Sequence, residues 1–250
     1  MKGFTSAVLG ILGCAVPMVA AAHPIMVQGT IVSNTVWNAG HGPYLIQGKL
    51  IVAKGATLRI EPGTQVAFAD GTGSQNGDSG IVVRGGLDAE GSAEKPIYFT
   101  AWTKGGKWGQ VYYEQSDAAH STLQHCVILG GRVVCKDSSP LIEECFLSGS
   151  REALVVDADS HPTITNNRIF GNAVGLTFLG EVSDAVVSGN CICDNGYGVC
   201  AASFGGTQLA QNHLFGNRSA DVMSPTDSVE LATASTTPQS GIIQVASLIQ

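Results

Sequence analysis

The chain of 250 residues carries 20 acidic side chains against 13 Lys and Arg, so its formal net charge is −7, and only 13% of its residues are charged. An acidic balance without a basic run argues against nucleic acid and against an anionic membrane surface as partners. Few charges combined with 32 glycines are typical of an elongated all-β protein, and helical signals are poor throughout.

The first segment, Met1–Ala22, has the pattern of a secretory signal peptide, because Lys2 precedes an apolar run that ends in small residues at Ala20–Ala22. We therefore expect a secreted, periplasmic or cell-surface protein without a transmembrane span. An alternative interpretation takes Ile11–Cys14 as a lipidation signal, which would anchor the chain through Cys14. Lys2 is the only charged residue of this segment, so its removal makes the mature chain still more acidic.

An N-terminal cap, residues 23–43, is predicted to precede a series of closely spaced strands separated by glycine-rich turns. These strands are expected within Tyr44–Val52, Ala56–Ala69, Ile81–Gly91, Pro96–Trp102 and Lys107–Glu114. The loop Asp70–Gly80 is rich in Asp, Asn and Gly, which makes calcium binding one interpretation. It lacks the spaced ligands and terminal Glu of an EF-hand loop, so a solvated insertion is the other interpretation.

The run from Gly29 to Glu114 resembles the N-terminal coils of secreted bacterial right-handed β-helix proteins of the pectin-lyase-like superfamily. The residues that carry the resemblance are Thr35–Trp37, Pro43–Tyr44, Leu58–Thr64, Gly86–Gly91, Pro96–Thr100 and Trp108–Gly109. The repeats that follow resemble those of the same group. The resemblance implies the fold, whereas only some members of the group cleave polysaccharide.

Five nine-residue units can be superimposed between Leu123 and Asn217. Each has Asn or Cys at its fourth place, Ile or Leu at its sixth, and a small or amide residue at its ninth. The fourth places are Cys126, Cys145, Asn167, Asn190 and Asn212, at steps of 19, 22, 23 and 22 residues. A period of about 20–25 residues with a short apolar unit and a turn indicates a solenoid.

The recurring amide narrows the solenoid to an all-β, right-handed parallel β-helix with three short strands per coil. An Asn that recurs once per coil lies about 4.8 Å from the next, so its side chain can donate to one neighbour and accept from the other. Such a turn also favours left-handed backbone, which Asn tolerates. We expect about eight coils of roughly 22 residues over residues 44–217.

The residues at the sixth place are expected to form an aliphatic stack that points inward. They are Ile128, Leu147, Ile169, Ile192 and Leu214. Phe170 and Phe215 share the seventh place, with Cys193 between them, and are interpreted as a file stacked within the solenoid.

Six cysteines remain beside Cys14, and disulfides are possible in an exported protein. Cys126 and Cys145 occupy the ladder position on adjacent coils, where they either form a bridge or replace Asn as small buried thiols. Cys191, Cys193 and Cys200 share one coil, which raises the possibility of zinc. A Cys-x-Cys pair with no placed His is weak support, so no metal site and no cofactor are predicted.

Whether the protein could be an enzyme depends on one exposed strand face, because pectate-lyase-like enzymes carry several carboxylates and an Arg there. In this register that face is the strand after each repeat unit, and Asp157 is its clear outward carboxylate. Asp137, Asp159 and His161 are candidates to join Asp157, while ordinary polar turn chemistry is the alternative. The register places no Arg on that face.

Aromatic side chains offer a second candidate site, since aromatic faces on a rigid solenoid can stack on sugar rings. The candidates are Trp102, Trp108, Tyr112 and Tyr113. Strand alternation puts Tyr112 and Tyr113 on opposite sides of a strand, so at least one of them is expected in the core.

The tail, residues 218–250, is rich in Ser and Thr and is interpreted either as a cap over the open end of the solenoid or as a linker. Taken together, the sequence predicts an exported, non-catalytic surface or carbohydrate-binding protein whose partner is a polysaccharide or cell-surface glycan. The alternative is a polysaccharide lyase or glycoside hydrolase that acts on an extracellular glycan.

Overall fold

The computed structural model describes residues 23–70, 79–181, 184–203, 209 and 211–224. The predicted signal peptide with Cys14, most of the proposed calcium loop and the tail beyond Ser224 lie outside these ranges. Within them, no helix has the length and apolar character that a membrane crossing requires.

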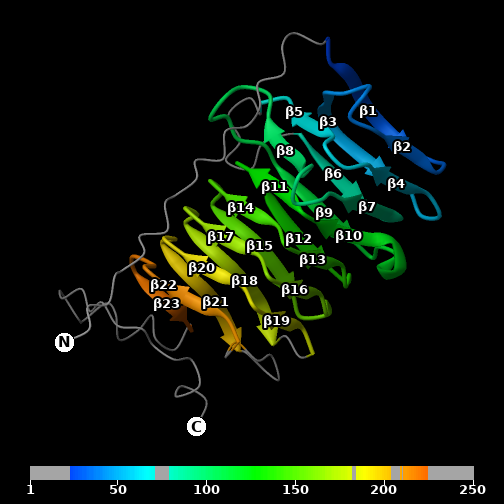
Figure 1. Ribbon diagram of the computed structural model, residues 1–250. Helices are drawn as coiled ribbons and strands as arrows, with labels where there is room; N and C mark the ends of the chain where they lie inside the picture. The colour runs from blue at the N-terminus through cyan, green and yellow to red at the C-terminus, as the bar shows by residue number, and fades with distance from the viewer. Residues whose placement is uncertain (1–22, 71–78, 182–183, 204–208, 210, 225–250) are drawn as a thin grey trace.

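The strands wind around one axis in stacked coils, and most coils contribute a strand to each of three faces (Figure 1). The first face contains the first half of β3 (Tyr44–Val52) and then β5 (Gln65–Phe68), β8 (Ile97–Ala101), β11 (Cys126–Leu129), β14 (Phe146–Ser148), β17 (Arg168–Phe170), β20 (Cys191–Cys193) and β22 (His213–Phe215).

The second face begins with the other half of β3, because this long strand bends at Gly48, whose φ is 69°. It continues with β6 (Gly80–Val83), β9 (Gln110–Glu114), β12 (Arg132–Lys136), β15 (Glu152–Asp157), β18 (Val174–Glu181), β21 (Tyr197–Ser203) and β23 (Ala220–Met223).

The third face is a separate seven-stranded sheet, and all strand pairs described in the molecule are parallel. Its members are β2 (Thr35–Trp37), β4 (Thr57–Ile60), β7 (Gly86–Glu90), β10 (Ser121–Gln124), β13 (Leu141–Glu143), β16 (Thr163–Thr165) and β19 (Val186–Ser188). In addition, β1 (Ile25–Ile31) pairs beside β3, and η1 (Ala118–His120) is a single 3-10 turn. The predicted parallel β-helix is confirmed.

The predicted asparagine ladder runs through Asn167, Asn190 and Asn212. The Nδ2 group of Asn167 donates to Oδ1 of Asn190 at 2.9 Å, and Nδ2 of Asn190 donates to Oδ1 of Asn212 at 2.8 Å. The same two oxygens also accept the backbone N–H of Asn167 and Asn190, at 2.9 and 3.0 Å. Nδ2 of Asn190 also donates to the carbonyl oxygen of Ile164 at 2.8 Å, so the donors and the acceptor of this buried amide all have hydrogen-bond partners.

The left-handed backbone lies one residue before the ladder position, and the prediction that the Asn itself adopts it is wrong. His125, Glu144 and Asn166 have φ of 46°, 51° and 56°, and Gly189 occupies the equivalent place with φ of 68°. This residue makes the bend between the third and first faces, and the next side chain then points into the solenoid. The Asn is therefore chosen for its amide and not for its backbone conformation.

Two further columns of hydrogen bonds serve the other turns. Between the first and second faces, Nδ2 of Asn172 donates to Asn195 at 3.0 Å, and Nδ2 of Asn195 donates to Asn217 at 3.1 Å. Between the second and third faces, the N–H of Ser138 donates to Oγ of Ser160 at 3.1 Å. Each turn of the coil is thus tied to the next coil through a polar side chain.

Cys126 and Cys145 continue the asparagine column as buried free thiols. The N–H of Cys145 donates to Oδ1 of Asn167 at 2.9 Å, and its thiol donates to the carbonyl of Leu123 at 3.3 Å. Burial raises the pKa of Cys126 well above its ordinary value, so this thiol stays protonated. The interpretation as small buried thiols in the ladder fits this structure, and a bridge is not formed.

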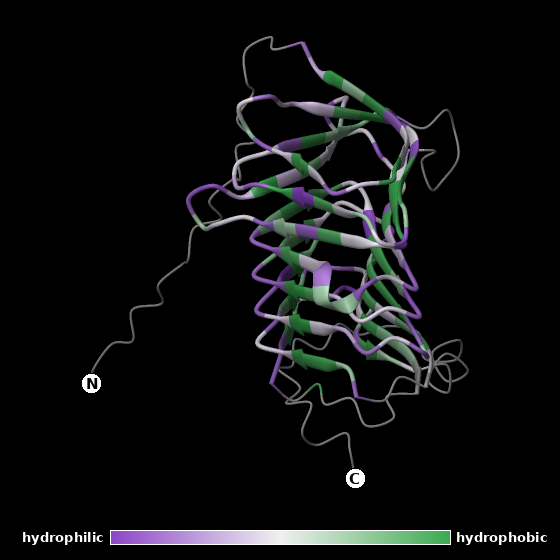
Figure 2. Ribbon diagram, turned by 90° about the vertical axis from the view of Figure 1, so that its right-hand side faces the viewer, coloured by the Kyte–Doolittle hydropathy of each residue, from purple (hydrophilic) through white to green (hydrophobic). Residues whose placement is uncertain are grey.

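The core fills the inside of the coils, where hydrophobic positions recur from one coil to the next (Figure 2). The predicted inward stack is confirmed, since Ile128, Leu147, Ile169 and Ile192 are fully buried and pair with one another in register. Full burial of one such side chain stabilises the fold by about 1.5–3 kcal/mol.

Trp108 and Tyr113 also belong to the core, and the prediction that they line a ligand site is wrong. Trp108 stacks on Phe68 with ring centroids 3.8 Å apart, and its Nε1 donates to the carbonyl of Leu129 at 2.8 Å. A Cβ at Gly131 would overlap the Trp108 ring, so glycine permits this approach. Tyr113 is fully buried, and its hydroxyl oxygen has no hydrogen-bond partner among the described residues.

The ladder predicts a stability loss for Asn190→Ala. The change leaves buried donors and acceptors on both neighbouring coils unpaired, which costs about 1–3 kcal/mol of the free energy of unfolding. Denaturant unfolding measures the loss. Gln211→Ala, which removes an exposed amide beside the ladder, serves as the control and should stay within about 0.5 kcal/mol of the parent.

The different environments of Trp108 and Trp102 predict different losses of stability when each is replaced by Ala. Trp108→Ala opens a cavity in the core and is expected to lower the free energy of unfolding by about 3–5 kcal/mol. Trp102, which is 49% exposed, should tolerate the same change within about 0.5 kcal/mol. Equal losses in thermal or denaturant unfolding of the two variants would show that Trp108 is not a core residue.

Candidate functional site

The predicted carboxylate cluster is only partly assembled. Asp157 lies at the outward end of β15, and its Oδ1 accepts the hydroxyl of Ser160 at 2.6 Å and the N–H of Asp137 at 3.3 Å. These bonds hold the turn after β15, while Asp159 and His161 lie exposed farther along that turn. The carboxylate of Asp157 therefore contacts the backbone of Asp137, but its hydrogen bonds stabilise the turn.

Among the residues in the described ranges, no three His, Cys, Asp or Glu side chains lie together in a way that could hold a metal ion. The three cysteines of this coil do not come together, because Cys200 lies on the second face while Cys191 and Cys193 lie on the first. The chain turns at Asn195 between them.

The outer surface of the second face carries an Arg that the sequence register missed. Arg132 begins β12, and its guanidinium donates to Gln110 at 2.9 Å and to Glu152 at 3.0 Å. Thr177 donates to the other oxygen of Glu152 at 3.4 Å. On the strands that follow β12 along this face, Leu154, Leu176 and Val199 are fully buried. The prediction that the register places no Arg on this face is wrong, because Arg132 lies on β12.

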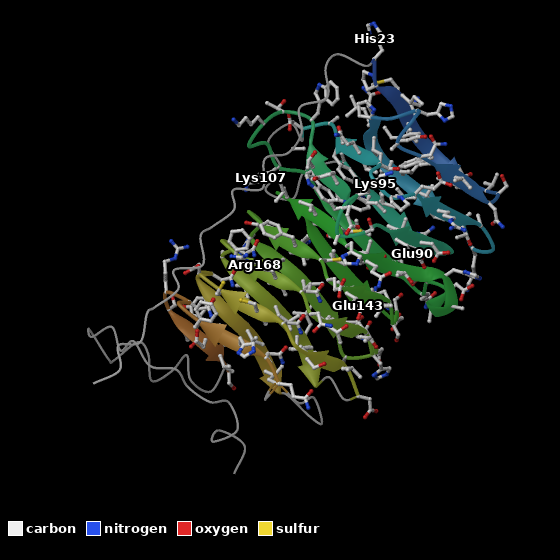
Figure 3. All side chains as sticks on the ribbon, viewed as in Figure 1. His23, Glu90, Lys95, Lys107, Glu143 and Arg168 are labelled. Carbon is white, nitrogen blue, oxygen red and sulfur yellow. The ribbon has the colours of Figure 1, made fainter. Side chains whose placement is uncertain are left out.

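The third face contains a small hollow. It is lined by Arg59, Ile60, Glu61, Pro62, Asp88 and Glu90 and has a volume of about 70 Å³. Pockets that bind small molecules typically enclose about 300–1,000 Å³. The acidic side chains of this face, with Glu90 and Glu143 marked in Figure 3, are spread along the sheet, and the hollow has no room for a sugar.

The outer surface of the first face is different, because aromatic and apolar side chains follow its strands from coil to coil. The strands alternate in two outward rows on either side of the buried inner row. The first row is Gln65, Tyr98, Val127, Phe146, Arg168, Cys191 and His213, and the second is Ala67, Thr100, Leu129, Ser148, Phe170, Cys193 and Phe215. We call these two rows the aromatic strip.

Phe170 and Phe215 therefore point outward, and their interpretation as a file inside the solenoid is wrong. The reason is strand alternation, since the sixth place of each unit is inward and the seventh must be outward. Phe215 is 48% exposed and Phe170 is half-buried. Sequence alternation alone was enough to place these rings on the surface.

Contacts within the aromatic strip fix the orientation of its rings. Phe146 and Phe170 on adjacent coils meet edge to face with centroids 4.6 Å apart. The guanidinium of Arg168, which is labelled in Figure 3, lies 5.4 Å from the centre of the Phe170 ring. Lys107 reaches across the turns beside the strip and donates to the carbonyl of Gly149. Two aromatic rings and a cation are thus held together on one rigid surface.

Of the four aromatic residues predicted to bind a ligand, two remain at the surface on different faces. Trp102 follows β8 directly and lies where the first face ends. Tyr112 lies half-buried on the outside of the second face, in register with Val82 and Val134. The predicted opposition of Tyr112 and Tyr113 is confirmed, whereas the four residues do not form one site.

Comparison with known proteins agrees with this architecture. Residues 105–238 match the family described as right handed beta helix region, and residues 29–115 match the pectate-lyase like beta helix domain. No curated protein and no solved structure matches the chain. Because the first match spans more than half of the 250 residues, the chain belongs to the family of right-handed β-helix proteins.

Proposed function

We propose that this protein is an exported, non-catalytic binding protein that holds a neutral polysaccharide along the aromatic strip. The observation that carries the proposal is the outward series of rings, which begins with Tyr98 and continues with Phe146, Phe170 and Phe215. An aromatic face covers the apolar face of a sugar ring without requiring a deep pocket.

The spacing of the coils supports an extended ligand. Successive coils are about 4.8 Å apart, which is comparable to the length of one sugar unit in an extended chain. A polysaccharide that lies parallel to the solenoid axis therefore meets one coil per sugar. The columns of hydrogen-bonded side chains at the turns hold the coils in register. The aromatic rings are therefore already ordered before the ligand binds, and binding does not incur that entropic cost.

Charge favours a neutral ligand over an acidic one. No Asp or Glu occupies an outward position of the strip from β5 to β22, where the ionisable side chains with nitrogen are Arg168 and His213. The chain as a whole carries a formal net charge of −7, which repels an acidic polymer at a distance. The donors of Arg168 can instead bind sugar hydroxyls beside Phe170.

The state of the outward carboxylates also supports a binding role. Glu152 is paired with Arg132, Glu114 with Arg84 at 2.8 Å, and Asp157 with Ser160. Acid and base catalysis on a glycan needs two carboxyl groups that face the same bond. Arg132 and Glu152 are the one observation that favours the alternative of a lyase or hydrolase, because they place a cation and an acid together on the second face.

Phe170→Ala should weaken binding of the polysaccharide. Loss of one ring from a stacked contact is expected to cost about 0.5–1.5 kcal/mol, which is a loss of roughly 2- to 13-fold in affinity. Isothermal titration against a panel of neutral and acidic polysaccharides measures the effect. Tyr112→Ala removes a half-buried ring from the second face and is the matched control, which should bind like the parent.

The proposal is contradicted if the parent protein binds no polysaccharide of the panel. It is also contradicted if Phe170→Ala and Tyr112→Ala lose affinity to the same extent, because the strip would then not be the binding surface. Thermal unfolding of both variants must first show that they fold like the parent.

No polysaccharide of the same panel is expected to be cleaved, with or without calcium. The assay is release of unsaturated ends or of reducing ends, which detects a lyase and a hydrolase respectively. Turnover that disappears in Asp157→Asn or in Arg132→Gln would establish the enzymatic alternative in place of the binding role. Arg59→Gln, which removes an exposed cation from the third face, is the control that should leave such turnover unchanged.

A further inference from the structure

Two thiols lie side by side on the outward side of the first face, near the C-terminal end of the described coils, where Cys191 is partly buried and Cys193 is 3% exposed. Cys191 and Cys193 are two residues apart on β20, so both side chains project to the same side of the strand, while Ile192 between them is fully buried. Their sulfur atoms lie 3.7 Å apart, and the Cys191 thiol donates to Cys193. The proposed stacking of sugar rings on the aromatic strip does not involve these two thiols.

The separation of the sulfur atoms suits a metal chelate. A tetrahedral zinc ion with Zn–S bonds of about 2.3 Å holds two sulfur ligands about 3.8 Å apart. The observed 3.7 Å already matches this spacing. A disulfide would instead need the sulfur atoms to approach to about 2.05 Å, which requires a larger rearrangement of the strand.

A third donor is placed by the register. His213 on β22 is the direct partner of Cys191 on the next coil, in the same outward row and one strand spacing away, about 4.8 Å. Its side chain is exposed, so a rotation about its side-chain bonds can bring the imidazole toward the sulfur atoms. In the positions described for these side chains the three groups do not yet form a metal cluster.

Two charged groups lie beside the pair of thiols. Arg168 is the register partner of Cys191 on the preceding coil, and Asp194 directly follows Cys193 on the chain. Arg168 lies against the Phe170 ring, which leaves the side of the pair toward His213 for a cation.

We propose that Cys191 and Cys193 form a two-thiolate site for a zinc-type metal ion, with the imidazole of His213 as its third ligand. Thiolate and imidazole are the donors that zinc prefers, and water completes the tetrahedron. Binding replaces the protons of both thiols, so up to two protons are released per ion. The site does not depend on glycan binding, because its three ligands are not among the Tyr and Phe rings proposed to stack on sugars.

Cobalt substitution tests the site directly, because Co²⁺ bound by thiolates gives an intense sulfur-to-metal charge-transfer band. The reduced, full-length protein should show this band with one equivalent of Co²⁺, and Zn²⁺ should displace it. Cys191→Ser and Cys193→Ser should each lose the charge-transfer band that the parent protein shows. His213→Ala should weaken Zn²⁺ binding and change the visible cobalt bands, while charge transfer from the sulfur atoms remains.

Cys200→Ser is the matched control, because Cys200 is also a partly buried thiol of the same coil but lies on the second face. It should keep the band and the affinity of the parent. The proposal is overturned if the reduced parent shows no charge-transfer band, if the band survives in Cys191→Ser, or if Cys200→Ser loses it to the same extent. Cys191 is only partly buried, so Cys191→Ser keeps the test valid even if Cys193→Ser folds poorly.

Discussion

The structure depends on side-chain amides that hydrogen-bond from one coil to the next. Asn190 shows the constraint most clearly, because it is fully buried and uses its amide toward Asn167, Asn212 and the backbone. A buried amide without partners costs about 1–3 kcal/mol, so each coil must return to the ladder after the same path. The steps of 22 or 23 residues between these asparagines follow from that requirement.

The same register determines what the surface can do. Alternation along each short strand places one residue inside and its neighbours outside, and the stacking of coils then turns single outward residues into rows. On the first face these rows bring Phe146, Arg168 and Phe170 together, and they also bring Cys191 next to His213. Binding surfaces on such a solenoid are therefore linear, which fits a polymer better than a compact ligand.

The period, the ladder and the inner stack could be predicted from the sequence, because repetition reveals residues that must satisfy one another. The candidate site could be predicted only in part. Trp108 and Trp102 look alike in the sequence, and only the contact of Trp108 with Phe68 decides which one is buried. The pairing of Arg132 with Glu152 depends on two strands 20 residues apart, outside the units that defined the register. Cys200 shares a coil with Cys191, but the bend between the two faces separates them.

Hydrogen exchange of the side-chain amides tests the central claim most directly. In an NMR spectrum recorded in D₂O, the NH₂ protons of Asn167 and Asn190 should persist far longer than those of Asn166, which is exposed beside the ladder. Asn172 and Asn195 of the second column should be protected in the same way. If the NH₂ protons of Asn190 exchange as fast as those of Asn166, the ladder does not hold the coils together and the account is wrong.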